Sequence, residues 1–313
     1  MLRLYDGHLS GADKLLHPER LQQLKQCLGF LFMSGFFQND IIVADFQDPY
    51  MMGADQLFYI CASGDFIKSD FLLDYLIGAM RRAGKLPEHP YFLKTIVTTE
   101  MARKVAEANG VTCCDTFTGF KFMAEKKNEL ESQGKGQVIM SYEESYGYML
   151  GDYVRDKDAV TASLILTEMA AWYAAQGMTL FDALNALYEK YGYYGEKTHN
   201  LVMPGLDGLE KMAQLMRDLR ADPPAAIAGV EVLRRKDYTD GSVIDCRTGE
   251  KSAMELSGSN VLRYELADGT TILVRPSGTE PKIKVYVLTI GETPAARDEN
   301  LRKYGEWVKT LQR

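Results

Sequence analysis

The stretch that decides the fold is residues 93–141, LKTIVTTEMARKVAEANGVTCCDTFTGFKFMAEKKNELESQGKGQVIMS, where short apolar runs alternate with longer polar segments. The runs Leu93–Val97, Val111–Asp115 and Gln137–Ser141 have the length and apolar content of buried strands. Strands that alternate with helix-length segments indicate a layered, mostly parallel α/β sheet. The sequence therefore predicts an α/β domain around these three runs.

The two polar segments between the runs carry the signals of helix ends. Thr98 or Thr99 is placed to cap a helix over Glu100–Asn109, and Gly110 is placed to end it. A second helix is expected from Thr118 to about residue 132. Further helices of this domain are predicted at Ser69–Ala83, Asp158–Gln176 and Thr179–Tyr191, after a linker with Pro87 and Pro90.

The predicted order of secondary structure changes after residues 192–196, where several short strands replace the alternation of strands and helices. A helix is expected over Asp207–Ala221, with Asp207 and Glu210 as a capping pair. The turn Ala267–Gly269 predicts a hairpin. The expected strands are Ala228–Arg234, Val261–Leu266, Thr270–Val274 and Ile283–Ile290, and the expected last helix is Asp298–Gln312. This pattern predicts a separate α+β domain.

Length and pattern together define the domain organisation. At about 100–200 residues per domain, 313 residues suggest two domains and a fragment of a third. We place the fragment at 1–66, the α/β domain at 67–193 and the α+β domain at 194–313. The fragment contains the apolar runs Asp40–Ala44 and Gln56–Cys61.

Composition excludes several classes of protein. The content of 46% hydrophobic and 25% charged residues is that of a globular chain, and no run approaches about 18 apolar residues, so neither a membrane span nor a secretory signal is expected. A net charge of −7 makes nucleic acid and anionic membranes unlikely partners. The five cysteines lack C-x-x-C spacing, which indicates a reducing, cytoplasmic compartment.

One segment has the chemistry of an anion-binding loop. Arg275, Ser277, Gly278 and Thr279 stand between two expected strands, and Lys282 and Lys284 follow on one face of the second strand. A glycine with positive φ would let amide groups converge on an anion, while arginine offers a bidentate contact to phosphate. Small, polar and basic residues are also those of exposed turns, so a surface turn remains an alternative at this point.

A second group of polar residues follows the strand Gln137–Ser141. Glu143 and Ser145 stand where ligands bind in open α/β sheets, beyond the carboxyl end of a strand. A carboxylate and a hydroxyl two residues apart suit neighbouring sugar hydroxyls, and Arg155 and Lys157 add positive charge. The alternative is that these are solvated loop charges.

At three loops the sequence resembles a known family. The motifs are DTFTGFKF (115–122), YEESYGYMLGDYVRDKDAV (142–160) and RPSGTEPKIKVY (275–286), in this order. They resemble those of the α-D-phosphohexomutases, which include phosphoglucomutase and phosphomannomutase, and the similarity extends from about Ser69 to the C-terminus. That family has four domains, and the resemblance implies that this chain is its C-terminal half: a sugar-binding α/β domain, a phosphate-binding α+β domain and a remnant of the metal-loop domain.

The resemblance also implies roles for individual residues. Contacts to a sugar are implied for Glu143, Ser145, Lys157, Thr118 and Gly119. Contacts to the phosphate that is not transferred are implied for Arg275, Ser277, Gly278, Thr279 and Lys284. The implied ligands are hexose phosphates, namely glucose or mannose 1- or 6-phosphate, and no residue of this chain is assigned as catalytic.

Two family features are missing from the sequence. No loop like the phosphoserine loop T-x-S-H-N-P occurs, and the Mg²⁺ loop D-x-D-x-D-R is replaced by a segment that keeps only Asp45, Asp48 and Asp55. Separations of three and seven residues do not suit one tight metal loop, so no metal is expected in this chain, although the complete family enzyme requires Mg²⁺. Two functions remain open: part of a mutase that needs a separate phosphoserine-bearing N-terminal half, or a non-catalytic phosphosugar-binding or regulatory module.

Overall fold

The computed structural model describes residues 41–42, 60–61, 69–144, 147–205, 207–278 and 280–312. Contacts divide the chain into two compact units, with the division between Tyr191 and Gly192. Within the first unit, β1 (Ile41–Ile42) pairs with β2 (Ile60–Cys61) in antiparallel register. Among the helices in these ranges, none combines the length and the apolar character needed to cross a membrane.

The sheet of the first unit is mostly parallel. Its order is β4-β3-β5-β6, in which β3 pairs in parallel with both β4 and β5, and β6 is antiparallel to β5. The strands are β3 (Pro90–Thr95), β4 (Thr112–Thr116), β5 (Gln137–Tyr142) and β6 (Tyr148–Met149). The layered α/β fold predicted from residues 93–141 is therefore confirmed.

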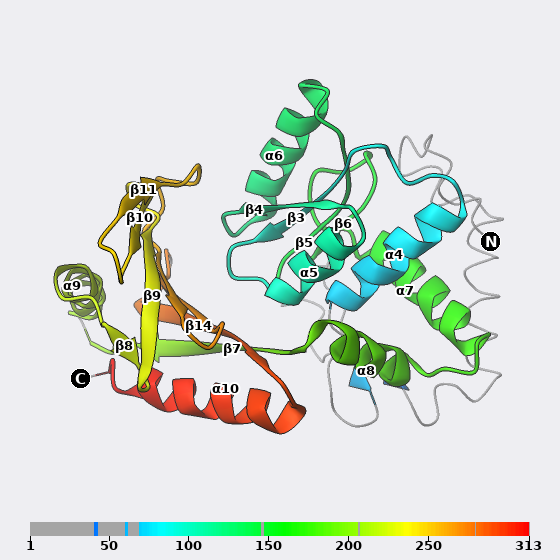
Figure 1. Ribbon diagram of the computed structural model, residues 1–313. Coiled ribbons are helices and arrows are strands. Elements are labelled where there is room, and N and C mark those ends of the chain that lie inside the picture. The colour runs from blue at the N-terminus through cyan, green and yellow to red at the C-terminus, as the bar shows by residue number, and fades with distance from the viewer. Residues whose placement is uncertain are drawn as a thin grey trace. The chain divides into compact units, whose positions relative to one another are not determined.

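Helices lie on both sides of this sheet (Figure 1). They are α4 (Ser69–Arg82), α5 (Glu100–Ala108), α6 (Phe120–Ser132), α7 (Ala159–Ala174) and α8 (Leu180–Tyr191). On one side, Phe120, Met123 and Leu130 of α6 pack with Leu93 of β3 and Val138 of β5. On the other side lie α4 and α5, which pack against each other.

The helix ends of this unit follow the expected local chemistry. Thr99 caps α5 because its side chain accepts a hydrogen bond from the amide of Met101 at 3.1 Å. Gly110 adopts φ +73°, which lets the chain turn away from the helix into β4. The placement of Pro90 in a linker is wrong, because Pro90 is the first residue of β3. A proline has no amide hydrogen to donate, but at the first position of a strand this costs little.

The second unit is built on an antiparallel sheet of eight strands, ordered β11-β10-β9-β12-β13-β14-β7, with β8 paired to β9. Its strands are β7 (Tyr193–Val202), β8 (Ala226–Ile227), β9 (Val230–Asp237), β10 (Ser242–Asp245), β11 (Lys251–Ala253), β12 (Leu262–Leu266), β13 (Thr271–Pro276) and β14 (Lys282–Gly291). The hairpin predicted across Ala267–Gly269 joins β12 to β13 and is confirmed.

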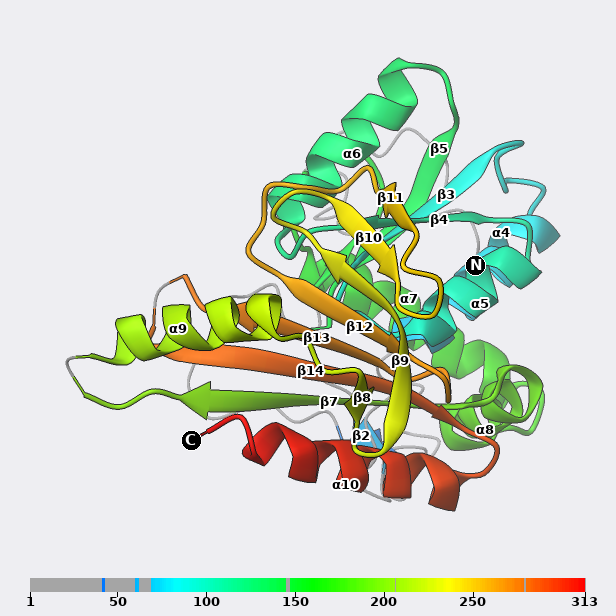
Figure 2. The ribbon, with the colours of Figure 1, turned by 60° about the vertical axis from the view of Figure 1, so that its left-hand side comes forward.

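Two helices, α9 (Gly208–Ala221) and α10 (Pro294–Lys309), cover one face of this sheet (Figure 2). Met212 and Met216 of α9 and Tyr304 of α10 share one buried cluster with Ile283 and Val285 of β14. The α+β architecture expected for the end of the chain is confirmed.

Three local expectations in this unit are wrong. Asp207 makes no capping hydrogen bond with its side chain; its carboxylate instead lies 2.9 Å from Lys211, one helical turn on. The strand expected over 228–234 begins two residues later, as β9, because Ala228 and Gly229 adopt φ +48° and +79° and form the turn between β8 and β9. The last helix begins before residue 298, where the hydroxyl of Thr293 accepts a hydrogen bond from the amide of Ala296 at 3.1 Å.

Candidate functional site

In the first unit, polar groups gather where the parallel strands end. The amide of Ile96, after β3, donates to the carbonyl of Thr116 at the end of β4 at 2.9 Å. The hydroxyl of Thr95 donates to Glu144 Oε2, beyond β5, at 3.0 Å. Since the carboxyl ends of parallel strands meet at one edge of a sheet, this edge is where a ligand is expected in an α/β domain.

A glycine brings three of the predicted site segments together. A Cβ placed on Gly147 would lie 2.6 Å from Lys157 Cδ, 2.6 Å from the ring of Phe120 and 3.1 Å from Glu143 Oε1. A side chain at this position would force Phe120 and Lys157 to shift, because real Cβ atoms essentially never lie closer than 3.0 Å to another heavy atom. Glu143, Lys157 and the first residue of α6 therefore converge at this point.

The start of α6 forms one wall of this group. Gly119 is the N-cap residue with φ +114°, and no side chain caps the helix. The first amides of a helix carry partial positive charge and attract anions or hydroxyl oxygens. Lys157 adds a full charge nearby, with Nζ 5.5 Å from the centroid of the Phe120 ring. Thr118 directly precedes this N-cap.

Below this edge, an ionic cluster around the buried Lys94 holds the strand ends. Lys94 is completely buried, and its ammonium lies 3.0 Å from Asp115 and 3.4 Å from Glu100. Arg103 completes the cluster at 3.0 Å from Glu100 and 2.6 Å from Asp115. Burial by itself would lower the pKa of Lys94, but the two carboxylates outweigh it and hold that pKa above its ordinary value.

The other predicted residues of this unit have different placements. Ser145 lies outside the described residues. On either side of it, the amide of Glu143 donates to the carbonyl of Gly147 at 3.1 Å. Arg155, expected to add charge for a ligand, instead donates to Asn128 of α6 at 3.1 Å and is exposed. Lys157 remains the cation of this group.

In the second unit, the predicted phosphate loop connects β13 to β14. Arg275 and Lys284 are direct cross-strand partners, so their side chains leave on the same face of the sheet. The amide of Ser277 donates to the carbonyl of Lys282 at 2.8 Å and closes the loop. The carbonyl of Pro281 accepts from the amide of Met203 at 2.8 Å, which ties the loop to the segment before α9.

This hairpin loop carries more positive than negative charge. Lys282 pairs with Glu280, whereas Lys284 has no carboxylate within 4 Å among the residues that the structure describes. The expectation of positive φ at Gly278 is wrong, since its φ lies outside the left-handed region. A Cβ at Gly278 would meet no described atom within 4 Å, so packing against the described residues does not require a glycine here. Thr279 lies outside the described residues.

Several residues of the site escaped the sequence analysis. Thr95 orients Glu144, Lys94 anchors the strand ends, and Phe120 and Gly147 bring Glu143 and Lys157 together. The signal for Gly147 was present, because a glycine between tyrosines in YEESYGY marks a close approach of the backbone. No local signal distinguishes Lys94 from an exposed lysine.

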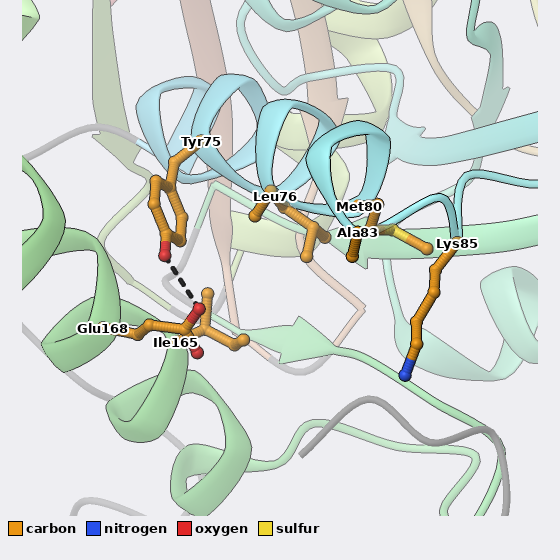
Figure 3. Close-up of a pocket in the computed structure, with 8 residues that line it drawn as sticks. Tyr75, Leu76, Met80, Ala83, Lys85, Ile165 and Glu168 are labelled. Atoms are coloured by element: carbon orange, nitrogen blue, oxygen red, sulfur yellow. Dashed lines mark hydrogen bonds between the residues drawn. The ribbon is translucent and has the colours of Figure 1, made fainter. Parts of the chain in front are cut away.

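A hollow between α4 and α7 is a different feature (Figure 3). Apolar side chains of Leu76, Met80 and Ile165 line it, and the hydroxyl of Tyr75 donates to Glu168 Oε1 at 2.9 Å. Its volume of about 10 Å³ is close to the minimum for a single water molecule. The hollow is therefore too small for a sugar phosphate.

The described residues do not form a metal site. No three side chains of the His, Cys, Asp or Glu type gather at one place in this part of the chain. Asp45, Asp48 and Asp55 of the altered metal loop lie outside the described residues. We therefore assign no Mg²⁺ ligand among the described residues.

Comparison with known families gives two matches, one within each unit. Residues 68–191 match phosphoglucomutase/phosphomannomutase, alpha/beta/alpha domain III. Residues 209–297 match phosphoglucomutase/phosphomannomutase, C-terminal domain. The chain belongs to the phosphoglucomutase/phosphomannomutase family. The family resemblance read from the three loops, and its limitation to the C-terminal half, are confirmed.

Sequence similarity to individual members of the phosphoglucomutase/phosphomannomutase family supports the same assignment. The chain is 35% identical over 199 residues to a phosphoglucomutase of Staphylococcus aureus and 34% identical over 196 residues to that of Staphylococcus saprophyticus. These alignments include 64% and 63% of this chain but only 36% and 35% of the relatives. The matched part thus spans about a third of the length of these curated relatives.

Solved structures of the family show the same fold. The phosphoglucomutase parafusin of Paramecium, in its open form, superposes with a TM-score of 0.56 at 18% identity, over 83% of this chain and 44% of that one. A phosphoglucomutase/phosphomannomutase family protein of Burkholderia thailandensis gives a TM-score of 0.52 at 16% identity, over 96% and 50%. At such identities the likeness concerns the fold alone.

Proposed function

We propose that this chain binds a hexose phosphate, as the C-terminal half of a phosphoglucomutase or phosphomannomutase. The first unit would contact sugar hydroxyls through Glu143, Ser145, Lys157 and the turn Thr118–Gly119. The second unit would hold the phosphate that is not transferred, through Arg275, Ser277, Gly278, Thr279 and Lys284. The domain bounds predicted from the sequence, 67–193 and 194–313, are part of this proposal.

The observation that carries the proposal is the positive hairpin loop of the second unit. The cross-strand pair Arg275 and Lys284 presents two cations side by side, and no described carboxylate pairs with Lys284. In a protein of net charge −7, this local surplus favours a doubly charged phosphate. Arginine can give two parallel hydrogen bonds, while lysine adds a mobile point charge.

Sugar recognition follows from the groups around Gly147. The Glu143 carboxylate accepts hydrogen bonds, whereas the Lys157 ammonium and the first amides of α6 donate them. Neighbouring sugar hydroxyls both donate and accept, so this mixed set suits a pyranose better than a bare anion. These groups bind and orient the substrate, and none of them is assigned a catalytic role.

The first test is titration calorimetry of the full chain with glucose 1-phosphate and inorganic phosphate. Arg275→Ala should weaken both ligands by about 1.5–3 kcal/mol, roughly 10- to 150-fold, the range for a charge-assisted contact. The matched control is Arg234→Ala, because Arg234 pairs with Glu265 and should leave both affinities unchanged. An Arg275→Ala chain with undiminished affinity would show that the loop assignment is wrong.

A second variant separates sugar from phosphate recognition. Glu143→Ala should change the preference between glucose 1-phosphate and mannose 1-phosphate while the affinity for inorganic phosphate stays constant. Equal losses for all three ligands would contradict the role given to Glu143.

Turnover distinguishes the two functions that remain open. The chain alone should show no phosphoglucomutase activity, because the phosphoryl donor of this family is a phosphoserine that this sequence lacks. Addition of a separate N-terminal half that carries the phosphoserine should restore turnover, with Mg²⁺ present. If the mixture stays inactive while binding persists, the non-catalytic binding or regulatory function is the correct one.

A further inference from the structure

A cavity of about 170 Å³ lies in the second unit, between the end of α9 and strands β9, β10 and β12. Leu219, Pro223, Ile244 and Tyr264 give it apolar walls. Arg235 enters it from β9 as the cross-strand partner of both Ile244 and Tyr264, so its side chain lies on the face that α9 covers. Arg275, Lys284 and the proposed phosphate loop belong to the opposite face of the same sheet.

The other arginine of the cavity is fully engaged. Arg220 Nε donates to Asp237 Oδ2 at 2.7 Å, and its Nη2 donates to Asp237 Oδ1 at 3.2 Å. The same Nη2 also donates to Thr239 at 2.9 Å and to Asn260 at 2.7 Å. Arg220 and Asp237 therefore neutralise each other and hold the end of α9 on β9.

Arg235 has no comparable partner. Its Nε is buried and has no hydrogen-bond acceptor, and no carboxylate of the described chain pairs with its guanidinium. Its neighbours differ, since Arg234 and Lys236 point to the other face and pair with Glu265 at 3.3 and 2.7 Å. A buried N–H without an acceptor is costly, so an acceptor from outside the chain is favoured here.

Charge and size define what would fit. Of the charged residues that line the cavity, Arg220 pairs with Asp237 and Lys236 pairs with Glu265, which leaves the charge of Arg235 unpaired among the described residues. The cavity is open to solvent, and its volume of about 170 Å³ is far above the minimum of about 10–15 Å³ for one water molecule, so a phosphate ion or a short carboxylate fits. The apolar walls suit a ligand with a small hydrocarbon part.

We propose that Arg235 binds a small oxyanion in this cavity, either a phosphate group or a carboxylate, separately from the phosphate loop at Arg275. The anion would accept the Nε–H of Arg235 and replace its missing acceptor. Because the walls come from α9 and from β9, bound anion would also stabilise the packing of α9 on the sheet. This site needs no sugar and does not depend on the proposed mutase function.

The test follows the Nε–H resonance of Arg235 by ¹⁵N NMR of the full chain, with the signal assigned by its loss in Arg235→Gln. Inorganic phosphate and acetate are titrated separately at constant ionic strength. We expect a saturable shift at about 1–10 mM, the range for one or two charge-assisted contacts. A response to phosphate alone identifies a phosphate site, a response to acetate alone a carboxylate site, and a response to both a general oxyanion site.

Two variants make the outcome specific. Arg275→Ala should keep the response of the Arg235 signal, because it changes only the loop on the opposite face; Arg234→Gln should keep it as well. The anion that shifts the Arg235 signal should also raise the melting temperature of Arg275→Ala. The same anion should not raise the melting temperature of Arg235→Gln. An unmoved Arg235 signal, or a shift that disappears in Arg275→Ala or Arg234→Gln, overturns the proposal, whereas failure of the mutase function would affect only the Arg275 site.

Discussion

The two units of the chain balance their clusters of charged side chains in opposite ways. In the first unit, two cations and two carboxylates are balanced around Lys94, which has no contact with solvent. In the second, three cations, Arg234, Lys236 and Arg263, each pair with the carboxylate of Glu265 on one sheet face of the described chain. Balanced charge has no capacity left for a ligand and serves to position strand ends. Surplus positive charge is what an anionic substrate requires.

We expect the largest effect on the free energy of unfolding in the Lys94 cluster of the first unit, where positive and negative charges are balanced. Lys94→Met should destabilise the chain by about 3 kcal/mol, because it removes the buried cation that Glu100 and Asp115 share and leaves these two half-buried carboxylates with one arginine. Urea unfolding followed by circular dichroism measures this. The control, Lys121→Met, removes a lysine that is 79% exposed and 3.9 Å from Glu125, and should change stability by less than about 0.5 kcal/mol.

A double variant tests whether the cluster acts as a unit. Lys94→Met combined with Asp115→Asn removes one charge of each sign, so it should recover part of the loss. If the single and double variants are equally unstable, the cost comes from lost packing of the lysine stem, and the contrast between the units would not be electrostatic.

The second prediction removes the carboxylate that three cations share. Glu265→Gln should cost about 2 kcal/mol at pH 7, the range for hydrogen bonds to charged groups. Burial by itself would raise the pKa of Glu265, but Arg263, Lys236 and Arg234 lower it further than burial raises it. Because the folded pKa is depressed, this stability is present above the unfolded value of about 4.3 and is lost as the pH falls through the folded value.

Unfolding midpoints at pH 7 and pH 3 measure the effect. The gap between the wild-type chain and Glu265→Gln should narrow at the lower pH, where the carboxylate is protonated as well. A gap that stays constant would mean that the charge of Glu265 contributes nothing and that the three cations are accommodated in another way.

Local chemistry was sufficient to predict much of the fold. The cap at Thr99, the stop at Gly110 and the turn at Ala267–Gly269 each depend on residues close in sequence, and the structure has all three. β7 escaped detection because it is an edge strand with polar residues such as Glu196 and Lys197, and its ten-residue pairing with β14 is a long-range contact. Strand formation of that kind depends on the partner more than on intrinsic preference.

In the candidate site, too, some features depend on residues close in sequence and others on long-range contacts. Arg275 and Lys284 were identified from residue type and spacing, but that they face each other follows from the register of β13 and β14 alone. The convergence at Gly147 joins residues from three segments, and no local pattern contains that information. Sequence thus reveals which chemistry is present, and register and packing decide which groups meet.

A third prediction concerns the link between the balanced cluster and the sugar-binding edge. The hydroxyl of Thr95 donates to Glu144 and lies 2.7 Å from the hydroxyl of Thr98. Thr95→Val keeps the shape but removes both bonds, so it should cost about 1 kcal/mol in unfolding. Glucose 1-phosphate affinity should fall while inorganic phosphate affinity stays constant, as calorimetry would report.

The matched control is Thr112→Val at the exposed start of β4, which should change neither quantity. If Thr95→Val lowers both affinities equally, the edge of the first unit does not recognise the sugar, and the division of labour between the units is wrong.

The smallest effect tests the helix-covered face of the second unit. His199 lies there as the cross-strand partner of Val285, and its ring packs beside Gly305 of α10. Burial, together with Lys197 and Lys309, lowers the pKa of His199 below its ordinary value. The unfolded chain therefore takes up a proton first, and stability should be lost as the pH falls from about 6.5 toward the folded pKa.

Urea midpoints at pH 7.5 and 5.5 measure this loss for wild type, for His199→Gln and for His89→Gln, which alters an exposed histidine as the control. The wild type and His89→Gln should fall in parallel, and His199→Gln should fall less, because it has no proton to gain at this place. If all three fall equally, the helix-covered face accepts an added charge without cost.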